Sequence, residues 1–134
     1  MGVIEYFDAP DVKRRIDEII ELLRFDHIRS ESIFCVRSRG SRAEKTIARI
    51  HGLSRIWQEA MGTEPAYIIE IIAERFDALS EEDQDRTLIH ELLHIPRGFR
   101  GGFRPHKGYV NREIVETWYR RLRQQKRRYE GTTP

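Results

Sequence analysis

The segment from Ser80 to Pro96 most constrains how this chain can fold, because its beginning, its apolar face and its end all predict one α-helix. Ser80 suits the N-cap position, and the three acidic residues after it favour the positive end of the helix dipole. Asp83 follows Ser80 by three residues, which loosely matches a capping box. Apolar residues then recur at helical spacing until Pro96, which ends the helix: Leu88, Ile89, Leu92 and Leu93.

Two histidines lie four residues apart on this predicted helix, His90 and His94, and Glu91 follows the first. Side chains at that spacing project from one face, so both imidazoles can reach one zinc ion. Glu91 stands where the metalloprotease pattern H-E-x-x-H places a general base that takes a proton from zinc-bound water. The pattern predicts a zinc-dependent hydrolase. The plainer alternative is a helix with two ordinary histidines and an incidental glutamate.

A catalytic zinc has three protein ligands and one open position, so a third ligand is needed. His106 is the first candidate, because it follows His94 across a loop that contains Gly98, Gly101 and Gly102. The alternative is Glu113 or Glu116 on the last predicted helix, which would give a two-His, one-Glu site as in gluzincins. The predicted metal site is therefore His90, His94 and His106.

The remaining hydrophobic patterns predict an α+β fold in one domain that spans residues 1–134. Helical spacing predicts helices over 10–25 and 111–129. Apolar runs rich in β-branched residues predict strands over 32–36 and 67–72. Residues 46–53 fit either a strand or a helix; we favour a strand, followed by a short helix through Ile56, Trp57 and Ala60. The predicted sheet is small, and it is either mixed or antiparallel.

Composition excludes several classes of protein. The single cysteine, Cys35, rules out an internal disulfide or a multi-cysteine zinc cluster. Because Cys35 lies in an apolar predicted strand, we expect it to be buried and to behave as a small hydrophobic residue. No apolar run reaches the length of about 18 residues that a membrane span needs. The N-terminus does not resemble a secretory signal. We therefore expect a cytoplasmic protein.

Positive charge is concentrated near the C-terminus, although the formal net charge is only +2. Residues 120–128 contain six basic residues, which could contact nucleic-acid phosphates. The alternative is a solvated end of a helix, where cations are favourable in any case.

The residues from His90 to Val110 resemble the zinc metallopeptidases of archaea and phages, a minimal zincin family distantly similar to SprT-like proteases. The resemblance covers about residues 33–120. It implies zinc bound by His90, His94 and His106, with Glu91 as the base, and a small sheet packed on the active-site helix. It also implies that strand 67–72 lies beside the substrate cleft. The metzincin spacing is absent, since Arg97 and Arg100 occupy those positions.

Several other residues have two interpretations. Tyr109, Arg104 or Lys107 could stabilise a transition-state oxyanion, or the two cations could be solvated while Tyr109 packs in the core. We expect structural roles for His27 and His51, and we expect core positions for Trp57 and Trp118. The predicted function is a zinc metallopeptidase with a peptide or protein substrate. Two alternatives stay open: a nucleic-acid-binding module with a structural zinc, and a zinc hydrolase of non-peptide amides.

Overall fold

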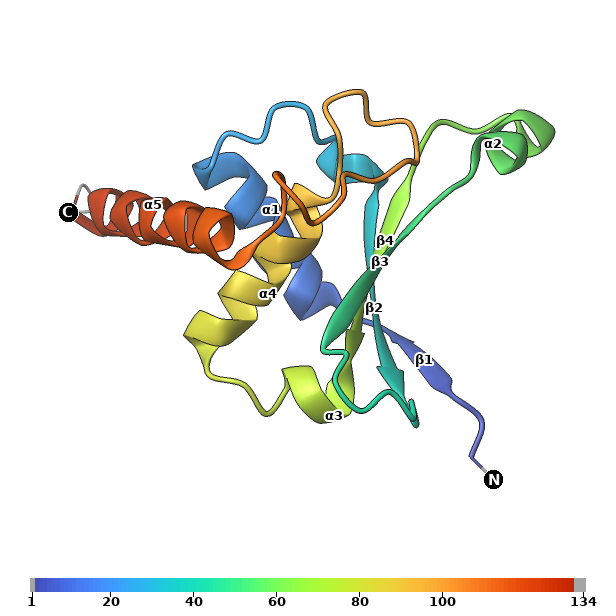
Figure 1. The fold of residues 1–134 in the computed structure, drawn as a ribbon, viewed down its shortest axis with the longest axis horizontal. Coiled ribbons are helices and arrows are strands. Elements are labelled where there is room, and N and C mark those ends of the chain that lie inside the picture. Colours follow the sequence, from blue (N-terminus) through green and yellow to red (C-terminus); the bar gives the residue numbers. More distant parts are fainter. Residues whose placement is uncertain (1, 132–134) are drawn as a thin grey trace.

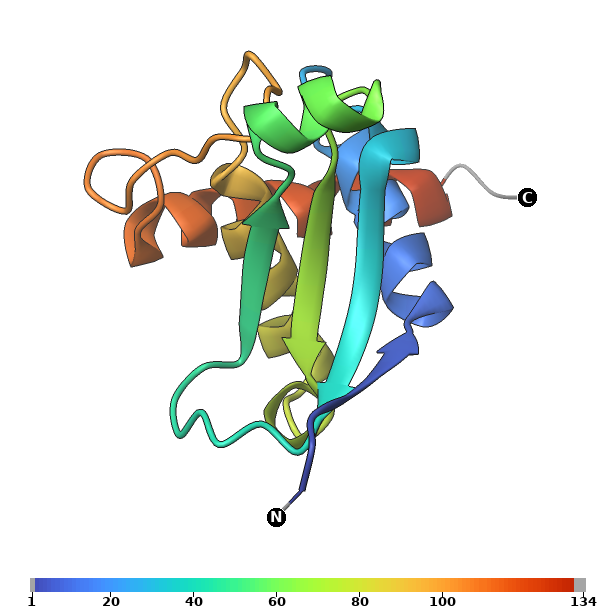
Figure 2. The same ribbon diagram turned by 90° about the vertical axis from the view of Figure 1, so that its right-hand side faces the viewer.

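A four-stranded mixed sheet forms one side of the molecule, and helices pack on one of its faces (Figures 1 and 2). The computed structural model describes residues 2–131. Across the sheet the strands run in the order β1 (Glu5–Asp8), β2 (Ile33–Arg39), β4 (Tyr67–Ile72) and β3 (Ala48–Gly52). The central pair, β2 and β4, is parallel, and both outer pairs are antiparallel. The predicted α+β class is confirmed.

The core lies between the sheet and two helices, α1 (Pro10–Leu22) and α4 (Glu81–Leu93). Alternate residues of β4 point toward the helices and are fully buried: Tyr67, Ile69 and Ile71. The last helix, α5 (Arg112–Gly131), packs on α1 and α4 as an outer layer. Cys35 is buried in this core as predicted, and burial raises the pKa of its thiol to about 12.

The predicted cap of α4 is present. The hydroxyl of Ser80 accepts a hydrogen bond from the backbone amide of Asp83 at 3.2 Å. Leu88, Ile89 and Leu92 are completely buried beneath the sheet, so one face of α4 is fixed against the core. Its opposite end stops at His94, which is the C-cap residue. The helix therefore presents His90 and His94 at its C-terminal end, where the following loop begins.

Several features of the fold differ from what the sequence predicts. Strand β1 and the short helix α3 (Ala73–Phe76) were not predicted, and α1 ends at Leu22 rather than at residue 25. Strand β4 lies inside the sheet between β2 and β3, so the outer strand next to it is β3. Trp57 is not a core residue: it is 60% exposed on α2 (Arg55–Met61), a helix with no buried residue that projects from the body (Figure 1).

Other expectations are met. Residues 48–52 do form a strand, β3, and a short helix follows it. Trp118 is only partly buried, but it packs against the core, edge-on to Phe25 with ring centroids 4.9 Å apart. His27 and His51 make ordinary contacts, His27 with the carbonyl of Ile95 and His51 with the carboxylate of Glu70. None of the helices in residues 2–131 combines the length and hydropathy of a bilayer crossing.

Candidate metal centre

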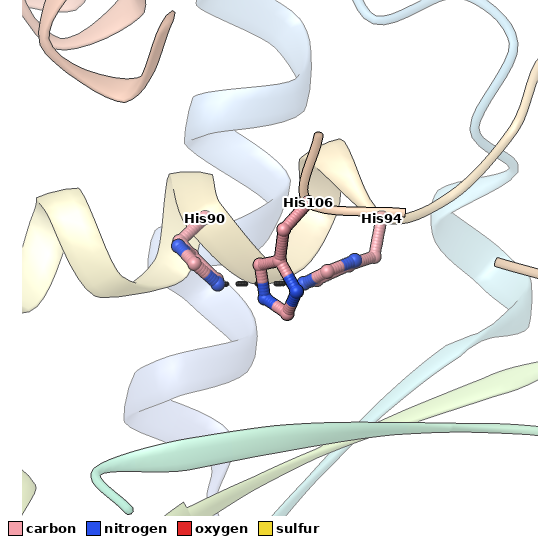
Figure 3. Close-up of side chains that lie close together, drawn as sticks. All are labelled: His90, His94 and His106. Carbon is pink, nitrogen blue, oxygen red and sulfur yellow. Dashed lines mark hydrogen bonds between the residues drawn. The ribbon is translucent and has the colours of Figure 1, made fainter. Parts of the chain in front are cut away.

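Three histidines converge beside the C-terminal end of α4 (Figure 3). His90 and His94 come from the helix, and His106 comes from the loop that follows it. One ring nitrogen of each lies within 4.8 Å of the other two. Among residues 2–131, this is the one group of three or more potential ligands close enough to share a metal ion. The structure thus brings together the three histidines that the sequence predicts as ligands.

The spacing of these nitrogens fits a tetrahedral metal ion. The Nε2 atoms of His90 and His94 are 3.3 Å apart, the separation drawn as a dashed line in Figure 3. Two nitrogen ligands at 2.0–2.1 Å from a tetrahedral ion lie roughly 3.3–3.4 Å from each other. The helix alone therefore holds two imidazoles at the separation that one zinc ion requires.

The tautomer of the neutral His94 ring is set by a hydrogen bond at Nδ1. Its Nδ1 lies 2.9 Å from the backbone carbonyl oxygen of Arg104. A carbonyl oxygen only accepts hydrogen bonds, so Nδ1 carries the proton and Nε2 presents its lone pair to the cluster. Metal-binding histidines commonly make this kind of bond, which sets both the tautomer and the ring orientation.

His90 is suited to metal binding because it stays neutral. Burial, followed by the nearby His94 and His106, lowers the pKa of His90 to about 4. A protonated imidazole cannot donate a lone pair, so a depressed pKa keeps the ligand available at neutral pH.

The loop that carries His106 is attached to both α4 and the sheet. The backbone amide of Arg104 donates to the carbonyl oxygen of His94 at 2.7 Å, so these two residues are joined by bonds in both directions. Further along, Gly101 passes so close to Gly52 that a Cβ on Gly52 would lie 2.1 Å from its carbonyl oxygen. Gly101 also has a φ of +101°, a backbone conformation that glycine adopts readily. The end of β3 and this loop can therefore pack together only through glycines.

Glu91 is a buried carboxylate without a hydrogen-bond partner at one oxygen. Glu91 is only 6% exposed. Among residues 2–131, its Oε2 has no hydrogen-bond partner. Burial raises the pKa of Glu91 to about 7 from its ordinary 4.5. A buried acceptor left without a partner costs free energy, so this oxygen marks a place where a polar group such as water belongs.

The histidines and Glu91 line one cleft between the sheet and α5. Its walls come from residues 45–50, from α4, from the His106 loop and from the first turns of α5. Residues 48–50 belong to β3, whereas β4 contributes no residue to this cleft. The expectation that β4 lies beside the cleft is wrong, because the sheet order places β3 between β4 and that space.

The other predicted site residues divide between the cleft and the surface. Glu113 and Glu116 line the cleft but lie outside the histidine group, and Glu116 accepts a hydrogen bond from Arg86 at 2.9 Å. Arg104 also lines the cleft. Neither Tyr109 nor Lys107 is among its lining residues. Tyr109 is 51% exposed rather than packed in the core, and the guanidinium of Arg104 lies over its ring.

Some cleft residues could not be selected from the sequence. Arg86, Thr87 and Phe103 line it, together with the first residues of β3. Arg86 and Thr87 precede His90 by about one turn on the same face of α4, a spacing that could have identified them. For β3 no comparable signal exists, since its place at the cleft depends on how distant strands pair.

Comparison with known protein families gives one match. A family model described as "Putative phage metallopeptidase" matches residues 4–130, nearly the whole chain. The chain belongs to that family. No curated protein and no solved structure gives a significant match. Membership of a metallopeptidase family indicates that the protein hydrolyses peptide bonds with the help of a metal. Among residues 2–131, His90, His94 and His106 form the group that could hold this metal.

Proposed function

We propose that this chain is a zinc metallopeptidase whose metal is held by His90, His94 and His106. Three neutral imidazoles form a ligand set that zinc commonly has in catalytic sites, with a fourth position left open. When bound there, zinc would activate a water molecule and polarise the carbonyl of the substrate. Within the described residues the group contains three possible ligands rather than four, which favours an open catalytic site over a closed structural one.

Glu91 would act as the general base. Its position next to His90 brings the carboxylate to the cleft, and the unpaired Oε2 is free to accept the proton of the attacking water. A general base works best when its pKa lies near the working pH, and the pKa of about 7 fits that requirement. This buried, unpartnered carboxylate beside three convergent histidines is the observation that carries the proposal.

A peptide substrate is favoured by the outer edge of β3. Strand β3 pairs with β4 on one side and is the last strand of the sheet in the described part of the chain. Its residues 48–50 also line the cleft. An extended peptide can add to such an edge through main-chain hydrogen bonds, which would place a peptide bond near the histidines. A small non-peptide amide would make no use of this edge.

Replacing Glu91 by glutamine tests the proposal. Glutamine keeps the size of the side chain but cannot accept the proton, so cleavage of a peptide library should fall by roughly 10²–10⁴-fold. Zinc content, measured in the same samples, should stay near one ion per chain. Glu82→Gln, an exposed change on the same helix, is the matched control and should cleave like the native protein. Equal cleavage by Glu91→Gln, or a native protein without zinc, contradicts the proposal.

A further inference from the structure

The outward face of α5 carries a row of arginines with no obvious structural use. Val115, Tyr119 and Leu122 on the opposite face are buried against the rest of the protein. Four arginines on the outward face are exposed, and we call them the arginine ridge: Arg120, Arg123, Arg127 and Arg128. At 1.5 Å per residue, the ridge extends for about 12 Å along the helix.

Cations of α5 and α4 that face the body of the protein are paired, in contrast to the ridge. Lys126 lies 3.4 Å from Asp85 and 3.6 Å from Glu18. Arg86 pairs with Glu116 at 2.9 Å. Among residues 2–131, the ridge arginines form no ion pair with an acidic side chain. Arg120 has an acidic neighbour that senses its charge, because the pKa of Glu116 is lowered first by its pairing with Arg86 and also by Arg120. The ridge is thus a set of neighbouring positive charges without a direct ion-pair partner in the described part of the chain.

Helix stability does not explain all of the ridge. Cations are favourable in the last turn of a helix, which covers Arg128 and its neighbour Arg127. Arg120 and Arg123 lie about two to three turns before the end of α5 at Gly131, where the dipole contributes little. On an isolated helix, neighbouring like charges are destabilising, so their concentration needs another cause.

The charge is also unevenly distributed along the chain. Residues 120–128 contain six of the 24 basic residues and none of the 22 acidic ones. The remaining 18 basic and 22 acidic residues give the rest of the chain a formal net charge of −4. The ridge is therefore a local positive surface on a chain that is otherwise negative, as expected for a site that attracts a polyanion.

We propose that the arginine ridge binds the phosphate backbone of duplex nucleic acid. A duplex carries about one negative charge per 1.7 Å, so a ridge of about 12 Å faces several phosphates at once. An acidic loop of a protein rarely presents so many negative charges over that length. Guanidinium groups also bind phosphate through two parallel hydrogen bonds. Within residues 120–128, the one apolar side chain, Leu122, is buried on the opposite face, so this stretch offers the solvent no apolar side chain to enter a bilayer and no aromatic ring to stack on a base. Binding should therefore be independent of sequence. This inference rests on α5 alone and does not depend on the proposed peptidase activity.

The test compares two charge-matched variants of the full chain. The ridge variant replaces Arg120, Arg123, Arg127 and Arg128 by glutamine. The control variant replaces four other exposed arginines without an ion pair by glutamine: Arg24, Arg42, Arg55 and Arg97. Affinity for a labelled duplex of about 20 base pairs is measured by fluorescence anisotropy from about 50 to about 200 mM salt. Four phosphate contacts predict that native affinity falls by about a hundredfold over this range.

The ridge variant should lose most of the affinity and nearly all of its salt dependence, whereas the control variant should bind almost like the native protein. A ridge variant with lysine at the four positions keeps the charge and should retain most of the binding, which separates charge from folding. Equal losses in the glutamine ridge and control variants would overturn the proposal. So would the absence of native binding at low salt, or native binding to phosphatidylserine vesicles but not to the duplex.

Discussion

The hydroxyl of Tyr67 accepts a hydrogen bond from the backbone amide of Gly101 at 2.9 Å and donates one to the carbonyl of the next residue, Gly102, at 2.8 Å. Tyr67 is fully buried in β4, and its ring also contacts Phe99 and Phe103 edge-on. A core residue of the sheet therefore holds the backbone of the loop that carries His106. Although β4 does not line the cleft, it positions one wall of it.

Removing this hydroxyl should weaken zinc binding. Tyr67→Phe keeps the ring but loses both hydrogen bonds to the loop, each with a net value of ~1 kcal/mol. Because His106 depends on that loop, we expect zinc affinity to fall by roughly tenfold or more, measured by competition with a chelator. Tyr6→Phe on the exposed surface of β1 is the control. Unchanged affinity in Tyr67→Phe would mean that the loop positions His106 without this contact.

A methyl group at Gly101 should be far more disruptive than one at Gly102. In Gly101→Ala the new Cβ would lie 2.2 Å from the carbonyl oxygen of Leu53, and the φ of +101° disfavours any L-residue. We expect a loss of stability of at least ~2 kcal/mol and weaker zinc binding. Gly102→Ala meets nothing within 4 Å and should behave like the native protein in both thermal unfolding and zinc titration.

Substitution of His106 should show whether the third metal ligand is this histidine or a glutamate of α5. His106→Ala removes one of the three convergent nitrogens, so purified protein should contain much less than one zinc per chain. Glu113→Ala and Glu116→Ala should keep their zinc, because both residues lie outside the histidine group. Zinc measured by mass spectrometry decides the question, and a glutamate variant that loses zinc while His106→Ala retains it would reverse the assignment.

The stability of the metal-free protein should depend on pH through Glu91. Because its folded pKa is raised to about 7 from 4.5, the unfolded chain releases this proton at lower pH than the folded chain. The contribution of Glu91 to the free energy of unfolding should therefore decrease as the pH rises from 4.5 to 7, by up to ~3 kcal/mol. The lowered pKa of His90 acts in the opposite direction in native protein and in Glu91→Gln alike, so the effect of Glu91 is the difference between these two proteins. Glu91→Gln lacks the ionisation, so without metal it should be more stable than the native protein at pH 8.

Urea denaturation with a chelator present, at about pH 4 and about pH 8, measures this effect. Near pH 4 the carboxyl is protonated in both states, so the advantage of Glu91→Gln should disappear there. Glu82→Gln is the control and should show no such change, because Glu82 is exposed. A difference between Glu91→Gln and native protein that is the same at both pH values would exclude ionisation as its cause.

Local signals in the sequence predict α4 and two of the three histidines well. The Ser80 cap and the His90–His94 spacing depend only on residues within a few turns of each other. The glycine-containing loop predicts His106 as the third ligand, but the position of that loop relies on Tyr67 and Gly52, which are distant in sequence. Such contacts arise from strand pairing, which no local pattern encodes.

The features that the sequence does not predict, or predicts wrongly, have the same physical origin, because they depend on which parts of the folded chain pack together. Strand β1 has no buried residue, so its sequence carries no alternation between a core face and a solvent face. Trp57 is a large apolar residue, but α2 packs against nothing that would bury it. The place of β3 at the edge of the sheet follows from the parallel pairing of β2 with β4, two strands far apart in the chain.

All three histidines lie within 17 consecutive residues, from position 90 to position 106. A metal ion shared by them would close a ring of the chain that contains only the end of α4 and the following loop. The entropy lost on closing so short a ring is small, so few other contacts are needed to bring the ligands together. Metal capture would thus be a local step, and chelation would free the His106 ring while Tyr67 still holds the loop at Gly101 and Gly102 and β1, β2 and α1 stay in place.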